Sequence, residues 1–205
     1  QISEVVKRIY SEGVYQRVDY SLTTTNGVTT LRFDVVSLPV IQSIRFRHLP
    51  ISEKLVMKGM RNSVGKPFNY HYLDSDIRYI NQLLDMQGYF LASVKSFQIL
   101  PNGVLSIDIE SPRLVGVEFI GLQSTKSSVV YREIVSKNGT YVDRYFLDVD
   151  YQSLMSLPYF SSVSAPNINY ISSDNVTVSY RVKERKMNRL DIGVEELEKD
   201  RRVAV

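Results

Sequence analysis

The sequence predicts an α+β chain of tandem β-α-α-β-β units, each a three-stranded sheet covered by two helices. Three observations support this prediction. A tripeptide ending in an aromatic residue recurs at spacings of 75 and 70 residues, as Gly13–Tyr15, Gly88–Phe90 and Pro158–Phe160. Apolar segments repeat at spacings of 73 and 74 residues, in the pairs 44–46 with 117–119 and 31–35 with 105–109. Between these anchors, helical and strand periodicities follow in one order, which indicates a repeated supersecondary unit.

The composition fits a folded chain and excludes several classes of protein. Hydrophobic residues make up 43% of the 205 residues and charged residues 23%, as in ordinary globular proteins and unlike disordered ones. No apolar run approaches the roughly 18–20 residues of a membrane helix. The absence of cysteine excludes disulfides, thiolate nucleophiles and cysteine-based zinc sites. A net charge of +3 favours neither nucleic acid nor anionic lipid.

Residues 1–38 predict the C-terminal part of a truncated unit. An apolar helix stripe comes first, at Ile2, Val5, Val6 and Ile9. Strands are expected over 14–22 and 30–36, on either side of an Asn26-Gly27 turn. The opening strand and first helix of the unit do not precede them, so we expect the chain to be cut from a longer protein.

Residues 39–111 predict a complete unit, which opens with a strand over 40–48. A short helix is expected to begin at Ser52, a favoured N-cap residue, and to end at Gly65-Lys66-Pro67. A second helix begins near Asn69, because apolar residues follow at helical spacing on one stripe: Leu73, Ile77, Ile80 and Leu84.

A hairpin completes this unit. Gly88 lies just past the second helix, where a C-cap glycine is expected. Residues 89–100 are rich in aromatic and β-branched side chains and predict a long strand. Pro101-Asn102-Gly103 predicts a turn, and the alternation over 105–109 predicts the last strand.

Residues 112–184 predict a second complete unit in the same order. Its expected elements are a strand over 114–122, a helix over 127–136, a break at Asn138-Gly139, a helical stripe at Leu147, Tyr151 and Leu154, and a hairpin of strands over 161–171 and 176–182.

Residues 185–205 predict a linker and the possible start of a transmembrane barrel. Leu190, Ile192 and Val194 alternate with polar residues, as in a barrel strand. A charged C-terminal tail explains the same residues, and the sequence leaves both interpretations open.

Catalytic, cofactor and metal motifs are missing from the sequence, so we expect no enzyme activity and no cofactor. His48 follows a strand and His71 lies between two tyrosines, and each is expected to be a loop or surface histidine. Asp74 and Asp76 open a helix, where the helix dipole favours negative charge. The 14 tyrosines are scattered along the chain, which argues against a nucleic-acid stacking platform.

The period of about 70–75 residues, the element order and the Gly88-Tyr89-Phe90 junction together resemble POTRA (polypeptide-transport-associated) domains. The resemblance covers about 180 residues and departs from the pattern at Pro158, which replaces the junction glycine. It implies the periplasmic arm of an outer-membrane POTRA-barrel protein in the bacterial outer membrane or the equivalent organelle membrane. The implied partners are unfolded or extended client polypeptides, with accessory assembly subunits as further candidates.

A β-α-α-β-β unit with strand order 1-3-2 leaves its second strand at the sheet edge, where an extended client can add by main-chain hydrogen bonds. The predicted client-binding residues open the second strand of the middle unit: Tyr89, Phe90, Leu91, Ala92, Ser93, Val94 and Lys95. Either Phe90, Ala92, Val94 and Ser96 or the alternate set Tyr89, Leu91, Ser93 and Lys95 would face the helices.

Two functions are compatible with this arm. In the first, the arm binds client polypeptides by β-augmentation during membrane-protein insertion or secretion. In the alternative, it is a spacer that connects a patatin-type lipase domain to an outer-membrane barrel, and its edges are covered by neighbouring units.

Overall fold

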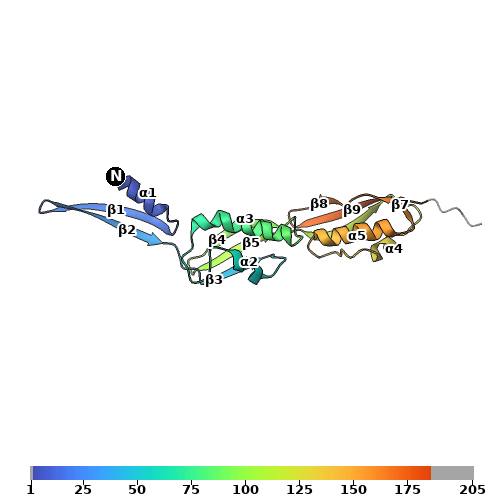
Figure 1. The fold of residues 1–205 in the computed structure, drawn as a ribbon, viewed down its shortest axis with the longest axis horizontal. Coiled ribbons are helices and arrows are strands. Elements are labelled where there is room, and N and C mark those ends of the chain that lie inside the picture. The colour runs from blue at the N-terminus through green and yellow to red at the C-terminus, as the bar shows by residue number, and fades with distance from the viewer. Residues whose placement is uncertain (1, 186–205) are drawn as a thin grey trace, which may run out of the picture.

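A computed structural model describes residues 2–185, which form an elongated row of three α+β units (Figure 1). The first unit contains helix α1 (Ile2–Tyr10) and the antiparallel strands β1 (Tyr15–Thr25) and β2 (Val28–Ser37). Asn26 and Gly27 both have positive φ, at 52° and 78°, as a two-residue type I′ hairpin turn requires. The predicted helix and hairpin of this unit are therefore confirmed.

The middle unit has the predicted element order. It contains β3 (Ser43–Arg47), α2 (Glu53–Gly59), α3 (Tyr70–Met86), β4 (Ser93–Ile99) and β5 (Val104–Glu110). The sheet order is β3-β5-β4, with β3 parallel and β4 antiparallel to β5. Both helices cover one face of this sheet, and Ile80 of α3 packs against Leu105 and Ile107 of β5 in one buried cluster (Figure 1).

The third unit repeats this order with a divided second strand. It contains β6 (Arg113–Ile120), α4 (Ser127–Arg132), α5 (Arg144–Ser156), β7 (Phe160–Val163), β8 (Asn167–Tyr170) and β9 (Asn175–Glu184). The sheet order is β6-β9-β7, and β8 also pairs with β9. The single strand predicted over 161–171 is wrong, because the ladder stops at Pro166, which has no N–H to donate. The helix predicted over 127–136 ends at Arg132.

Each complete unit buries one carboxylate on its second helix. Asp76 of α3 accepts hydrogen bonds from the backbone N–H of Arg61 at 2.7 Å and from the backbone N–H and Nδ2 of Asn62 at 3.1 and 2.9 Å. Asp150 of α5 lies 74 residues further on and accepts from the N–H of Val135 at 2.6 Å. The helix-dipole explanation of Asp76 is therefore wrong: this carboxylate holds the loop that follows the first helix.

A carboxylate at the end of β9 fixes another loop. Glu184 accepts hydrogen bonds from the backbone N–H of Thr125 at 2.8 Å and of Ser124 at 2.9 Å. These two bonds, that of Thr125 being the stronger, lower the pKa of Glu184 from 4.5 to about 2. Because the pKa is lowered on folding, the carboxylate stabilises the unit above about pH 4.5 and loses this contribution as the pH falls towards 2.

We therefore expect the amide resonances of Ser124 and Thr125 to titrate with a midpoint near pH 2 in an NMR pH series. The Glu184→Gln variant carries no titrating group at this position, so its Ser124 and Thr125 resonances should stay constant in the same series. A midpoint near pH 4.5 in the unsubstituted protein would show that the two hydrogen bonds do not hold the carboxylate.

No helix within residues 2–185 is long and apolar enough to cross a membrane. The proposed barrel start at Leu190, Ile192 and Val194 lies outside the described residues. The domain limits 39–111 and 112–184 stay predictions, which the separate sheets and separate core clusters of the middle and third units support.

Candidate functional site

The candidate client-binding site is the free edge of β4 in the middle unit. β5 is the only strand that pairs with β4 among residues 2–185, so the opposite edge of β4 carries no strand (Figure 1). β4 is seven residues long, whereas the corresponding edge of the third unit is divided into β7 and β8 of four residues each. At this corresponding edge, the middle unit therefore offers the longer continuous strand.

Four of the residues predicted to bind client, Tyr89, Phe90, Leu91 and Ala92, precede the strand, so their predicted place on the edge strand is wrong. Ser93, Val94 and Lys95 do belong to β4. The N–H of Tyr89 donates to Leu84 O at 2.9 Å and that of Ala92 donates to Tyr89 O at 2.9 Å, so this segment is a turn. Phe90 and Leu91 pack against the core of the third unit. Phe90 and Leu91 therefore lie at the junction between units, and Ala92 is buried in the core of the middle unit, so none of these is part of the free edge of β4.

A β-bulge at Lys95 changes which side chains of β4 face the helices. Val94 pairs with Ile109 and Ser96 pairs with Asp108, so Lys95 is the extra residue. Past the bulge, Phe97 and Ile99 pack against the buried core together with Val94. Neither alternating set predicted from the sequence is therefore correct, because a bulge reverses the alternation after it.

The hairpin turn determines which main-chain groups point to the free edge. The N–H of Leu100 donates to Val104 O, and Leu100 O accepts from the N–H of Gly103, each at 2.9 Å. The main-chain N–H and C=O groups of Leu100 therefore point towards β5. Because these groups alternate in direction along an antiparallel strand, those of Phe97 and Ile99 point to the free edge. These four groups can pair with an added strand.

The start of β4 is already occupied by a side chain of α3. The backbone N–H of Val94 donates to Oδ1 of Asn81 at 2.8 Å. A strand that adds to β4 therefore finds its donors in the C-terminal half, beyond the bulge at Lys95. Nothing in the local sequence marks Asn81, because its contact depends on how α3 packs against the sheet.

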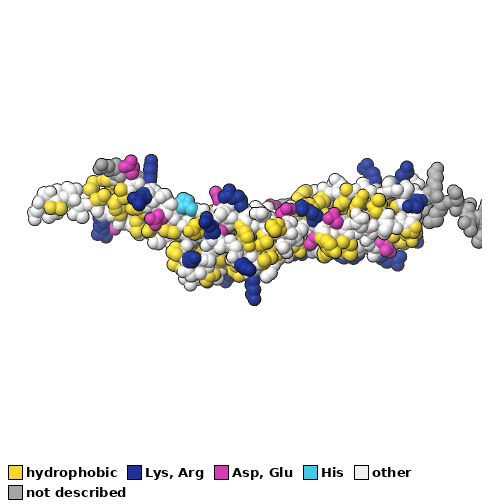
Figure 2. Space-filling view, viewed as in Figure 1, with side chains coloured by type: hydrophobic (Ala, Val, Ile, Leu, Met, Phe, Trp, Pro, Cys, Tyr) yellow, Lys and Arg dark blue, Asp and Glu magenta, His cyan; other side chains and the backbone are white. Residues whose placement is uncertain are grey.

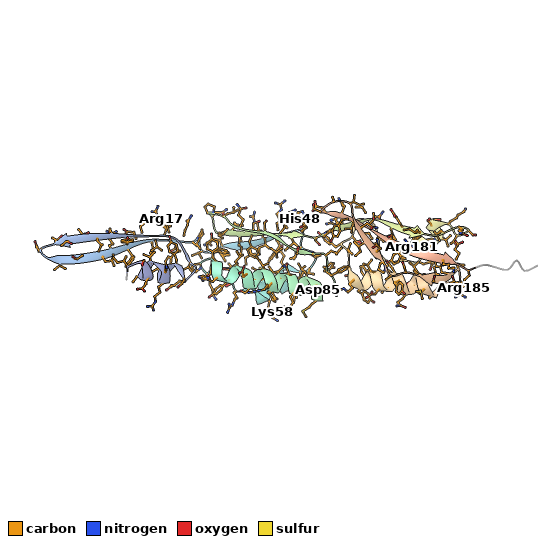
Figure 3. The ribbon with its side chains drawn as sticks, turned by 90° about the horizontal axis from the view of Figure 1, so that it is seen from above. Arg17, His48, Lys58, Asp85, Arg181 and Arg185 are labelled. Atoms are coloured by element: carbon orange, nitrogen blue, oxygen red, sulfur yellow. The ribbon has the colours of Figure 1, made fainter. Side chains whose placement is uncertain are left out.

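The face of the middle sheet that is turned away from the helices is polar. Arg45 of β3 and Gln98 of β4 are opposite Ser106 of β5, one on each side. His48 is exposed on this side, and its Nδ1 lies 3.0 Å from Oδ1 of Asp108 (Figure 3). Lys and Arg side chains are scattered along the visible face without a basic stripe (Figure 2). Binding at this edge would therefore rely on main-chain pairing more than on charge.

Metal chemistry has no support in the described part of the chain, where no three His, Cys, Asp or Glu residues gather around one point. His71 is exposed beside Asn69, the N-cap of α3, whereas His48 pairs with Asp108 of β5. The two histidines therefore belong to different contacts. The unpaired main-chain groups at the edge of β4 are of the kind that hydrogen-bond an added strand.

The comparisons with known proteins agree with this architecture. The N-terminal domain of Omp85 from the thermophilic cyanobacterium Thermosynechococcus elongatus superposes with a TM-score of 0.75 at 20% identity, over 90% of this chain and 83% of that chain. POTRA1-3 of the periplasmic domain of Omp85 from Anabaena gives 0.67 at 21% identity, over 91% and 81% of the two chains. CdiB from Acinetobacter baumannii gives 0.54 at 17% identity, over 90% and 37%.

One curated protein is similar in sequence. The outer membrane protein assembly factor BamA of Nitratidesulfovibrio vulgaris is 21% identical over 215 residues, which cover 89% of this chain and 26% of that protein. This chain thus spans about a quarter of the length of that relative. No protein-family model matches the chain. The structural likenesses confirm the α+β fold and the POTRA resemblance predicted from the sequence.

Proposed function

We propose that this chain is part of the periplasmic arm of an outer-membrane POTRA-barrel protein and binds extended client polypeptides during membrane-protein insertion or secretion. The similarity to Omp85 and BamA proteins supports the arm and its place in the periplasm, attached to the outer membrane. The free edge of β4 is the observation that supports client binding. Accessory assembly subunits are further candidate partners of the same arm.

In the proposed mechanism the client adds as a new strand beside the C-terminal half of β4. The main-chain groups of Phe97 and Ile99 pair with the client backbone, so recognition depends on an extended conformation more than on sequence. Client side chains on one side lie next to α3, and those on the other side lie next to the polar face around Gln98. An amphipathic extended peptide, such as a barrel strand, fits these two environments.

The experiment is NMR chemical-shift mapping with an extended peptide derived from a barrel strand. We expect perturbations at Ser96–Ile99 and on the adjoining face of α3. A peptide that is N-methylated at alternate residues loses the donors that face β4, and we expect it to lose these perturbations. Proline at Ser93 or Val94 is less informative, because the N–H of Val94 is bonded to Asn81.

A matched pair of cross-linking variants separates the free edge from general adsorption. Gln98 and Arg45 are both exposed and flank Ser106, so a photo-cross-linking side chain at either position lies on the same face of the sheet. Cross-links to the peptide from position 98 and none from position 45 would support addition to β4. Equal cross-links from both positions, or no shifts at millimolar peptide, would contradict it.

The alternative function is a spacer that connects a patatin-type lipase domain to the barrel. The backbone hydrogen bond between Arg144 of the third unit and Gly88 of the middle unit favours this alternative, because it joins neighbouring units directly. A spacer requires no client. The absence of peptide binding, together with a fixed orientation of the middle unit relative to the third unit, would therefore support the spacer function.

A further inference from the structure

The two junctions between units are built in the same way. At the first junction, the N–H of Tyr70, the first residue of α3, donates to Gly13 O at 3.0 Å. At the second junction, the N–H of Arg144, the first residue of α5, donates to Gly88 O at 2.9 Å. The first N–H groups of a helix have no partner within the helix. In both cases a carbonyl of the preceding unit supplies that partner.

The residue before each helix adds a second contact. Asn69 caps α3 by accepting from the N–H of His71 at 2.8 Å, and its Nδ2 donates to Glu12 O of the first unit at 2.8 Å. Asp143 caps α5 by accepting from the N–H of Tyr145 at 2.7 Å. Asn69 thus bonds the preceding unit directly, and Asp143 lies next to Gly88, where an added Cβ would be 2.8 Å from its Oδ1.

The glycines are required by both conformation and space. Gly13 and Gly88 have φ of 73° and 92°, in the left-handed region that other residues rarely adopt. A Cβ at Gly88 would lie 2.8 Å from Oδ1 of Asp143, and one at Gly13 would overlap Asn69 Oδ1 and the ring of His71. Any larger residue would therefore push the cap away from the junction.

Charged and aromatic contacts strengthen the second junction. A guanidinium nitrogen of Arg144 lies 2.9 Å from Oδ1 of Asp85, which is at the end of α3 (Figure 3). The Cζ of Arg144 lies 4.9 Å from the ring centre of Phe90. Burial raises the pKa of the Tyr89 hydroxyl, and the nearby carboxylate of Asp143 raises it further. Tyr89 also meets Tyr141 of the third unit edge to face, with ring centres 6.5 Å apart.

In the third unit, proline replaces glycine at the first position of the tripeptide 158–160. Pro158 cannot adopt a positive φ. The carbonyls of Tyr159 and Phe160 instead accept from the N–H and Nε of Arg185, both at 2.7 Å (Figure 3). Within residues 2–185, glycine therefore opens the two tripeptides whose carbonyl bonds a following helix, and proline opens the tripeptide whose next two carbonyls bond Arg185.

We propose that Gly13 and Gly88 form a repeated joint, in which the glycine carbonyl of one unit completes the N-terminal cap of the second helix of the next unit. The joint fixes the orientation of adjacent units, because the same hydrogen bonds that cap α3 and α5 also span the boundary. This role is independent of client binding at β4.

The test compares Gly88→Ala with Gly65→Ala and Gly139→Ala in the full chain. All three glycines have φ between 85° and 92°, but a Cβ at Gly65 or Gly139 meets nothing within 4 Å. Residual dipolar couplings of the middle and third units should fit one alignment tensor in the unsubstituted protein and in both controls. In Gly88→Ala they should need two tensors, and exchange of the Arg144 amide should rise about tenfold.

A second variant keeps the glycine and every backbone donor. Arg144→Gln removes the contacts to Asp85 and Phe90, and we expect amide exchange at residue 144 to rise about threefold. Lys58→Gln removes a positive charge from α2 away from the junction and should leave this amide unchanged (Figure 3). The proposal is overturned if the unsubstituted units need two tensors, or if Gly88→Ala behaves like its glycine controls.

Discussion

Replacing Asp76 by alanine should destabilise the middle unit by about 2–5 kcal/mol, because it leaves buried N–H donors without an acceptor, at about 1–3 kcal/mol for each such group. Asp76 is 1% exposed, and its carboxylate accepts three hydrogen bonds from Arg61 and Asn62. Asn62 in turn bonds Asn69, the cap of α3, so the loss would spread to the first junction. Urea unfolding measures the change in the free energy of unfolding, and hydrogen exchange of the β5 amides shows that the middle unit is the part destabilised.

The control for this variant is Asp74→Ala on the same helix. Asp74 is exposed, so its replacement should change the free energy of unfolding by no more than about 0.5 kcal/mol. If the two variants unfold at the same urea concentration, the hydrogen bonds of Asp76 do not stabilise the middle unit and the carboxylate does not hold the loop.

Much of the fold could be predicted because its elements have strong local periodicity. The stripe at Leu73, Ile77, Ile80 and Leu84 predicted α3, which begins one residue after Asn69 and ends at Met86. The aromatic segment at Tyr89–Ala92 was wrongly placed in a strand for a physical reason. Aromatic residues favour both strands and buried junctions, and only tertiary structure shows that Phe90 packs on the neighbouring unit.

The candidate site was less predictable than the fold. The edge position of β4 follows from the strand order 1-3-2, which the sequence argument took as its condition and which the structure has. The bulge at Lys95 and the contact of Asn81 with Val94 depend on packing and leave no local signal. The buried carboxylates did leave one: Asp76 and Asp150 each lie seven residues after the cap of their helix, and comparison of the repeats could have found them.

The second large effect is expected from a substitution in the core of the third unit, which is separate from the core of the middle unit. Leu154 is fully buried in a cluster with Val130, Leu147 and Val178, all from the third unit. Leu154→Ala removes most of this side chain and should destabilise the third unit by about 2–5 kcal/mol. Met155 is 45% exposed, so Met155→Ala is the matched control and should change stability by about 0.5 kcal/mol or less.

The effect of Leu154→Ala on the middle unit should be much smaller. The buried clusters of the two units are separate, and the contacts across the boundary include the hydrogen bond from Arg144 to Gly88, worth about 1 kcal/mol, and the packing of Phe90 and Leu91 against the third unit. Native-state hydrogen exchange measures both units at once: β9 amides should lose protection by the full destabilisation and β5 amides by no more than the contribution of the joint. Equal losses in β5 and β9 would show that residues 39–184 unfold as one cooperative unit, and the predicted boundary near residue 111 would then be wrong.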